Sequence, residues 1–155
     1  MSEVQLTPRQ KAREIAFQFL YRYDPLNPTA TAEHEIEVEF EKHLAHFGNF
    51  QHSREFALRL IQTTVRELAR IDSLIEKQAH HWKLDRIGAI DKAFLRMGIA
   101  ELVFFKEVPA SVTLNEVIEL SKSFGEADTP LFLNGILDPI SKLPEALAGK
   151  VASDS

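Results

Sequence analysis

The segment from Thr7 to Tyr23 repeats apolar residues every three or four positions, which is the period of one face of an α-helix. The apolar positions are Ala12, Ile15, Ala16, Phe19, Leu20 and Tyr23. Thr7 is a suitable N-cap, and Pro8 suits the first helical position because its missing N–H would have no partner there. Pro25 and Pro28 cannot continue the helix. The pattern therefore predicts an amphipathic first helix.

Residues 33–40 have a mixed pattern, because glutamates alternate there with less polar residues at the period of a strand. Glutamate favours helix, however, and Leu44 and Phe47 extend the apolar pattern at helical spacing. We predict a helix in this region, with Gly48 as its C-terminal stop.

Two longer apolar patterns follow. Residues 53–78 keep one apolar face and predict a single long helix. The positions on that face are Phe56, Leu60, Thr64, Leu68, Ile71 and Ile75. Residues 86–105 are apolar around most of the helical circumference. A helix of that kind lies at the centre of a fold or beneath a partner.

Capping residues define the helix expected next. Thr113 and Glu116 have the spacing of a capping box, in which the threonine caps the helix and the glutamate lies three residues on. This predicts a helix from Thr113 to Phe124, which Gly125 terminates.

The last helix is predicted from the Asp-Thr-Pro sequence at 128–130 to about Ser141. The chain turns small and polar from Pro144, so we expect one domain over residues 1–143 and a mobile tail over 144–155. With about six or seven helices and no hairpin signal, the chain is predicted to be all-α, a compact helical bundle.

Composition excludes several kinds of chemistry. The 155 residues include no cysteine, which rules out disulfides, thiolate zinc sites and cysteine nucleophiles. No phosphate-binding glycine loop, dinucleotide turn or serine-nucleophile motif is present. His43 and His46 lie three residues apart, but no carboxylate pattern completes a metal site. We predict a protein that is not an enzyme and that has no cofactor and no bound metal.

Charge is distributed unevenly along the chain. The net charge is −5, which is unusual for a protein that binds long nucleic acids without specificity. The first helix nevertheless carries four basic residues and only Glu14 as an acid, whereas residues 33–41 hold five glutamates. A basic patch on an acidic body is therefore expected, and binding depends on the local field. No apolar segment resembles a signal peptide or a membrane span, so we expect a cytoplasmic protein without membrane contact.

Arg9, Arg13, Phe17 and Tyr21 follow one another along the first helix at intervals of four residues. Guanidinium groups pair with phosphates, and aromatic rings stack on unpaired bases, as recognition of single-stranded RNA requires. The alternative is that Phe17 belongs to the core and the basic residues only solubilise the helix. Periodicity alone favours this alternative.

Charged residues also interrupt the apolar segment at 86–105. They are Asp91, Lys92, Arg96 and Glu101. A charge in such surroundings needs a partner, because burying it alone is costly. An internal ion pair is the first expectation, and contact with a bound macromolecule is the alternative.

Four blocks in this order resemble the NusB family of transcription antitermination factors. The first is residues 9–21, RQKAREIAFQFLY. The second is WKLDRI at 82–87 with IDKAFLR at 90–96. The third is Val108-Pro109 with LNEVIELSKSFG at 114–125, and the fourth is FLNGILD at 132–138. Each block is weakly specific, but four in order are strong evidence.

The resemblance implies a NusB-like helical fold that binds single-stranded boxA-type RNA. It also implies a partner, the small-subunit ribosomal protein NusE, and a role with the RNA polymerase antitermination complex in ribosomal RNA transcription. The RNA-binding residues it implies are Arg9, Lys11, Arg13, Gln18, Tyr21, Arg96, Asp128 and Phe132. Asp91 and Phe94 would face or support the NusE surface.

Two positions depart from the family pattern. Gln10 interrupts the basic run, and Leu131 stands where a basic residue can precede Phe132. Fewer cations weaken the hold on phosphates, so a partner protein is expected to supply further contacts. The other function that these features allow is a protein–protein module without RNA contact of its own.

Overall fold

A computed structural model of the chain describes residues 6–23, 33–46, 51–80 and 83–151. Within these ranges it holds eight α-helices, one short 3₁₀-helix and no strand, which confirms the all-α prediction. The helices are α1 (Pro8–Arg22), α2 (Glu33–Leu44), α3 (Gln51–Arg66), α4 (Leu68–Gln78), η1 (Leu84–Arg86), α5 (Ala89–Phe104), α6 (Ala110–Phe124), α7 (Thr129–Ser141) and α8 (Pro144–Leu147). None of these helices is long and apolar enough to cross a membrane.

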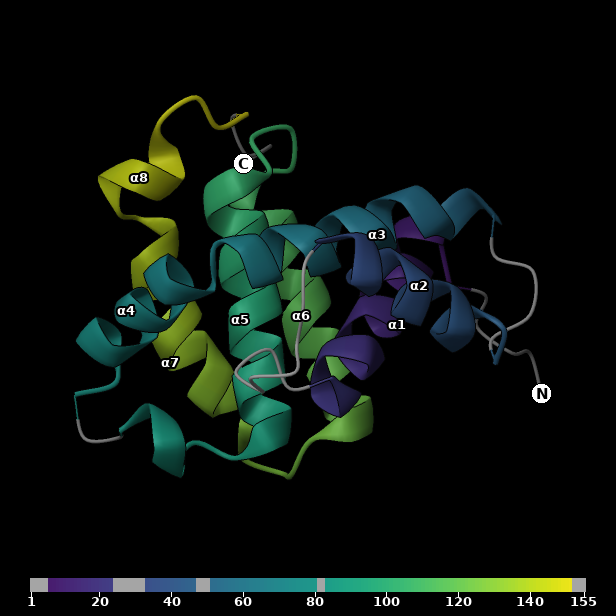
Figure 1. Cartoon of the computed structure of the whole chain (residues 1–155). Helices are drawn as coiled ribbons and strands as arrows, with labels where there is room; N and C mark the ends of the chain where they lie inside the picture. The colour runs from purple at the N-terminus through teal and green to yellow at the C-terminus, as the bar shows by residue number, and fades with distance from the viewer. Residues whose placement is uncertain (1–5, 24–32, 47–50, 81–82, 152–155) are drawn as a thin grey trace.

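Helix α5 is the centre of the fold (Figure 1). It packs against α1, α3, α4, α6, α7 and α8. Every residue from Ala93 to Val103 is buried, which confirms that this apolar helix lies inside the molecule. Helices α1 and α3 form the closest long pair, and α2 covers them at the end of the molecule far from α7 and α8.

Two helix boundaries differ from the sequence prediction, and so does the position of the capping box. The predicted helix over 53–78 is divided at Glu67, where the backbone leaves helical geometry between α3 and α4. Helix α6 begins at Ala110, so Thr113 is a buried residue of its first turn and does not cap it. The capping box lies instead at Thr7 and Gln10, where each side chain bonds the other residue's backbone N–H.

Residues 144–151 pack onto the domain, whereas the sequence suggested a mobile tail from 144. Ala146 of α8 is buried, and the Val151 N–H donates to the Lys106 carbonyl oxygen at 2.9 Å. The Lys150 Nζ atom donates to the carbonyl oxygens of Glu101, Leu102 and Phe105 at 3.0, 3.0 and 2.9 Å. These carbonyls lie at the C-terminal end of helix α5, where those of Glu101 and Phe105 also accept the N–H groups of Phe105 and Val108 at 3.1 and 3.2 Å. Lys150 is therefore an additional donor that caps this end of the helix. Residues 152–155 lie outside the described ranges.

Candidate nucleic-acid interface

We call Arg9, Arg13, Phe17 and Tyr21 the α1 row. It is exposed at its ends and buried in its middle. Arg9 is exposed, and its guanidinium lies over the Phe56 ring at 4.7 Å from the centroid. Tyr21 is 49% exposed at the other end of the helix. Gln18 is half-buried beside it, and the half-buried Lys11 lies 3.6 Å from Glu14. The exposed ends therefore offer a cation and a ring to a ligand.

Arg13 lies inside the molecule, with only 2% of its surface exposed. Its Nε atom donates to both carboxylate oxygens of Glu101 at 3.2 and 2.9 Å, and its Nη2 atom donates to the same group. This placement corrects the prediction that Arg13 contacts RNA directly. The physical reason is that a buried Glu101 needs a cation, and α1 crosses α5 where Arg13 can supply it.

Arg96 is placed in the same way. Its Nε and Nη2 atoms donate to the two carboxylate oxygens of Asp72 on α4 at 2.9 and 3.0 Å, and both residues are buried. Direct contact with RNA does not fit this geometry either. The internal ion pairs expected for charges on the apolar helix are thus present for Arg96 and Glu101.

Phe94 also lies in the core and is not a surface residue. Its side chain is fully buried, and its ring stacks on Phe17 with centroids 3.8 Å apart and planes within 4°. It therefore cannot face a partner protein. Its packing on Phe17 holds α1 against the start of α5.

Asp91 belongs to a polar cluster at the start of α5 and α7. The Thr129 hydroxyl donates to Asp91 Oδ1 at 3.0 Å and accepts the Glu126 N–H at 3.0 Å. Burial raises the pKa of Asp91, the Thr129 hydrogen bond opposes this, and the charges of Asp128 and Glu126 raise it further. A side chain at Gly125 would lie 2.7 Å from the Thr129 side chain, so this turn needs a glycine.

The segment before and within α7 gives the other predicted contacts. Asp128 is exposed next to the Asp91 cluster, and Phe132 is half-buried one turn into α7. Leu131, which lies between these two residues in the sequence, is 79% exposed. An exposed carboxylate and a half-buried ring therefore lie at the start of α7, near the Asp91 cluster.

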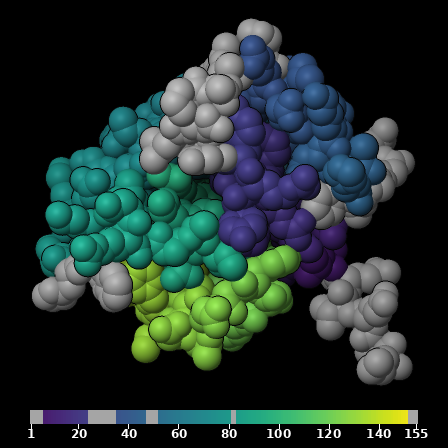
Figure 2. Space-filling view, turned by 60° about the horizontal axis from the view of Figure 1, so that its bottom comes forward, coloured from purple at the N-terminus to yellow at the C-terminus, as the bar shows by residue number. Residues whose placement is uncertain are grey.

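An apolar pocket lies between α1, the start of α5 and the end of α6, and we call it the Tyr21 pocket. It has a volume of about 270 Å³. Its lining residues are Phe17, Gln18, Tyr21, Arg22, Ile90 and Phe124. Figure 2 shows this face of the molecule, with α1 beside the start of α5 and the end of α6. The pocket can take a flat apolar group beside the exposed Tyr21 ring.

Sequence reasoning missed Arg22, Ile90 and Phe124 as members of this site. Ile90 and Phe124 were assigned to helix patterns, and nothing local shows that the two helix ends meet at α1. Arg22 was recognised only as part of the basic first helix. In the described part of the chain, no group of three or more His, Asp or Glu side chains is arranged to hold a metal ion.

Comparisons with known proteins agree with this architecture. Residues 10–142 match the model of the NusB family. The chain is 39% identical to the transcription antitermination protein NusB of Nitratiruptor sp. over 137 residues, 88% of this chain and 94% of that protein. It is 37% identical to NusB of Desulfotalea psychrophila over 135 residues, 87% of this chain and 96% of that one.

Solved structures give the same result. A T. maritima NusB structure has a TM-score of 0.70 and 31% identity, covering 89% of this chain and 93% of its own. A structure of antitermination factors NusB and NusE in complex with dsRNA has a TM-score of 0.75 and 30% identity, covering 89% and 98%. The four sequence blocks therefore predicted the right family, and that family is one of antitermination factors and not of enzymes. The chain belongs to the NusB family.

Proposed function

We propose that this protein binds single-stranded boxA-type RNA together with NusE and so supports antitermination of ribosomal RNA transcription with RNA polymerase. The observation that carries the proposal is the Tyr21 pocket, an apolar recess next to an exposed ring on a basic helix. Unpaired bases stack on rings of this kind, and a duplex keeps its base faces covered. A structural relative is described with NusE and dsRNA, so duplex RNA is a necessary competitor in any test.

The exposed residues divide into two roles in this proposal. Arg9 and Lys11 pair with phosphates, which position the strand. Tyr21 and Phe132 stack on bases, while Gln18 and Asp128 hydrogen-bond to base edges, which supplies selectivity. Arg13 and Arg96 act from inside the fold by holding α1 and α4 against α5. Phe94 supports the same helix contact from the core.

NusE is placed at the start of α5 in this proposal. Asp91 and Asp128 make that surface acidic, and a ribosomal protein offers complementary basic residues. The exposed Leu131 next to it adds an apolar contact. The same features suit the second candidate function, a protein–protein module that needs no RNA contact.

The test is RNA binding at matched salt with three probes, which are boxA RNA, a scrambled RNA of equal length and boxA annealed to its complement. Each probe is measured with and without NusE. We expect the protein with NusE to prefer single-stranded boxA at least tenfold, because bases are read only when unpaired. Equal binding of the scrambled strand would contradict the proposal. NusE binding that is insensitive to salt and to RNA would support the second candidate.

A further inference from the structure

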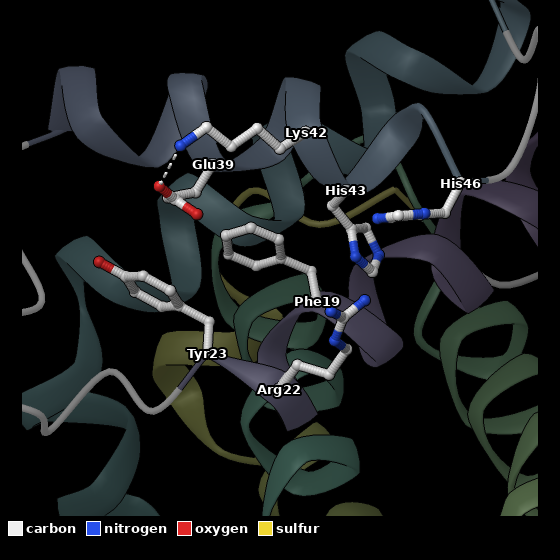
Figure 3. A pocket seen from close by; sticks show the side chains of 7 residues that line it. All are labelled: Phe19, Arg22, Tyr23, Glu39, Lys42, His43 and His46. Carbon is white, nitrogen blue, oxygen red and sulfur yellow. Dashed lines mark hydrogen bonds and ion pairs between the residues drawn. The ribbon is translucent and has the colours of Figure 1, made fainter.

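A second, more polar pocket lies where the last turn of α1 meets the C-terminal half of α2, and we call it the α1–α2 pocket (Figure 3). Its volume is about 180 Å³. Its lining residues are Phe19, Arg22, Tyr23, Glu39, Lys42, His43 and His46. Arg22 also lines the Tyr21 pocket, so the two recesses are neighbours along α1.

Cationic and N–H donor groups converge on one side of this pocket. Figure 3 shows the Arg22 guanidinium directed toward the His43 ring, with the His46 ring approaching from the other side. Burial lowers the pKa of His43, the Ile15 carbonyl near its Nε2 atom raises it, and the positive charges of Arg22 and His46 lower it further. The two side-chain charges that lower the pKa of His43 are thus both positive.

Three carboxylates of α2 form hydrogen bonds or ion pairs with neighbouring side chains. Glu39 accepts a hydrogen bond from Lys42 Nζ at 3.2 Å, and both side chains lie to one side of the histidines. Glu37 accepts from Gln62 at 3.3 Å, and Glu41 pairs with Arg54 on α3. Glu37 and Glu41 are thus turned to α3, whereas Glu39 lines the pocket as an ion pair with Lys42, beside Arg22 and the two imidazoles. Besides these groups, only the Tyr23 hydroxyl among the lining residues can ionise.

We propose that the α1–α2 pocket binds a phosphate group, and that in the RNA complex this group belongs to the strand that continues past Tyr21. The second half rests on the proposed function. The volume suits a phosphate better than a drug-sized ligand, whose sites measure about 300–1,000 Å³. The Arg22 guanidinium and the His46 imidazole are phosphate donors, while His43, whose Nε2 atom lies 3.2 Å from the Ile15 carbonyl oxygen, contributes positive charge when it is protonated. The positive charge of Arg22 disfavours a metal ion at the same histidines.

Phosphate binding in this pocket is coupled to protonation. An anion next to His43 favours the imidazolium form, so the bound state takes up protons that the free protein lacks near neutral pH. Affinity therefore rises as the pH falls from about 8 to about 6.

The first experiment follows the imidazole NMR signals of the full chain during titration with inorganic phosphate, against chloride at equal ionic strength. We expect saturable shifts of His43 and His46 that need less phosphate at the lower pH. Arg22→Ala abolishes saturation. Arg66→Ala is the matched control, because both arginines occupy the last turn of a helix and Arg66 is far along α3 from the pocket. Chemical shifts that change linearly with phosphate, or saturation that survives Arg22→Ala, would overturn the proposal that the pocket binds phosphate.

The second experiment separates an RNA phosphate from free phosphate. A boxA strand is compared with the same strand extended by a few nucleotides at either end in turn. We expect one extension to tighten binding about fivefold, and Arg22→Ala and His46→Gln to remove the gain and lower the salt slope by about 0.7. His80→Gln, at another exposed histidine, keeps the gain.

The outcomes distinguish the two proposals. Saturation by phosphate without any gain from the extensions would overturn the RNA assignment and leave a free-phosphate site. If no single-stranded RNA binds while phosphate still saturates the histidines, the proposed function fails and the pocket stands. If the wild-type chain shows neither saturation by phosphate nor a gain from the RNA extensions, the proposal of a phosphate site in this pocket is overturned.

Discussion

The inner and outer members of the α1 row are of the same residue types but have opposite surroundings. Arg9 and Tyr21 stand at its ends and are exposed, whereas Arg13 and Phe17 stand between them and are buried. Each step of four residues turns the row by about 40° around the helix. The middle of the row therefore faces α5, and its two ends emerge on either side of that contact.

This difference shows that residue type and spacing identify a row but not its function. Arg13 and Arg9 are both arginines of the same basic helix, yet only Arg13 meets a buried carboxylate. The inner pair fixes how α1 lies on the core, and the outer pair presents groups to a ligand. Substitutions at the inner positions should therefore change folding stability, and substitutions at the outer positions should change RNA binding.

The largest effect is expected for Arg13→Ala, which leaves the carboxylate of Glu101 buried without its cation. We expect the free energy of unfolding to fall by about 3–5 kcal/mol, as for other broken buried pairs. Urea unfolding followed by circular dichroism measures this loss.

The matched variants for this prediction are Arg9→Ala and the double substitution Arg13→Met with Glu101→Leu. Arg9→Ala should change stability by no more than about 0.5 kcal/mol, because its side chain is exposed. The double variant should recover part of the loss, since no charge is left buried alone. A loss below about 1 kcal/mol for Arg13→Ala would show that the inner and outer arginines do not differ in this way.

The next effect concerns the rings. Tyr21→Ala should weaken binding of single-stranded boxA RNA by about 1–3 kcal/mol, because one base loses its stacking partner. Tyr21→Phe should keep most of the affinity, and neither change should lower stability much. Phe17→Ala, the inner counterpart, should instead cost about 3–5 kcal/mol of folding free energy. Fluorescence anisotropy and urea unfolding separate the two results, and equal stability losses at both rings would contradict the comparison.

Local patterns predicted the helices of this fold better than they predicted its site. The capping residue Thr7 and the apolar circumference of α5 were visible because both depend on neighbours within a few positions. A need for a partner was visible at Glu101, but its identity was not, because Arg13 is 88 residues away in the chain. The division at Glu67 and the meeting of Ile90 with Phe124 also depend on tertiary packing. Family resemblance supplied candidate residues, and only the packing sorted them into exposed and buried ones.

A smaller effect is expected at the outer arginine. Arg9→Ala should weaken RNA binding about tenfold and reduce the slope of log affinity against log salt by about 0.7, the value for one phosphate contact on a single strand. Arg9→Lys should keep the slope, because charge determines it. It should still lose some affinity, because a lysine stacks less well on Phe56. An unchanged slope for Arg9→Ala would remove this residue from the phosphate contacts.

The smallest effect is expected for Lys150. Its amine donates to carbonyl oxygens at the end of α5, including that of Glu101, the partner of Arg13. Burial lowers the pKa of Lys150 from 10.5 to about 8, while nearby Glu101 and Glu107 raise it and Lys106 lowers it. Between pH 8 and pH 10.5 the unfolded chain therefore holds a proton at this residue that the folded chain has released. Stability attributable to Lys150 must then rise with pH across this window.

We expect that rise to be about 1 kcal/mol, because partial solvation screens the charged amine. The measurement is the free energy of unfolding at several pH values in this window for the wild-type chain and for Lys150→Met. Other titrating groups are common to both proteins, so the difference between the two curves isolates Lys150. The wild-type curve should climb relative to the variant. Parallel curves would mean that the amine is solvated in the folded protein and does not cap α5, and that the Arg13–Glu101 pair is held without help from this end of the chain.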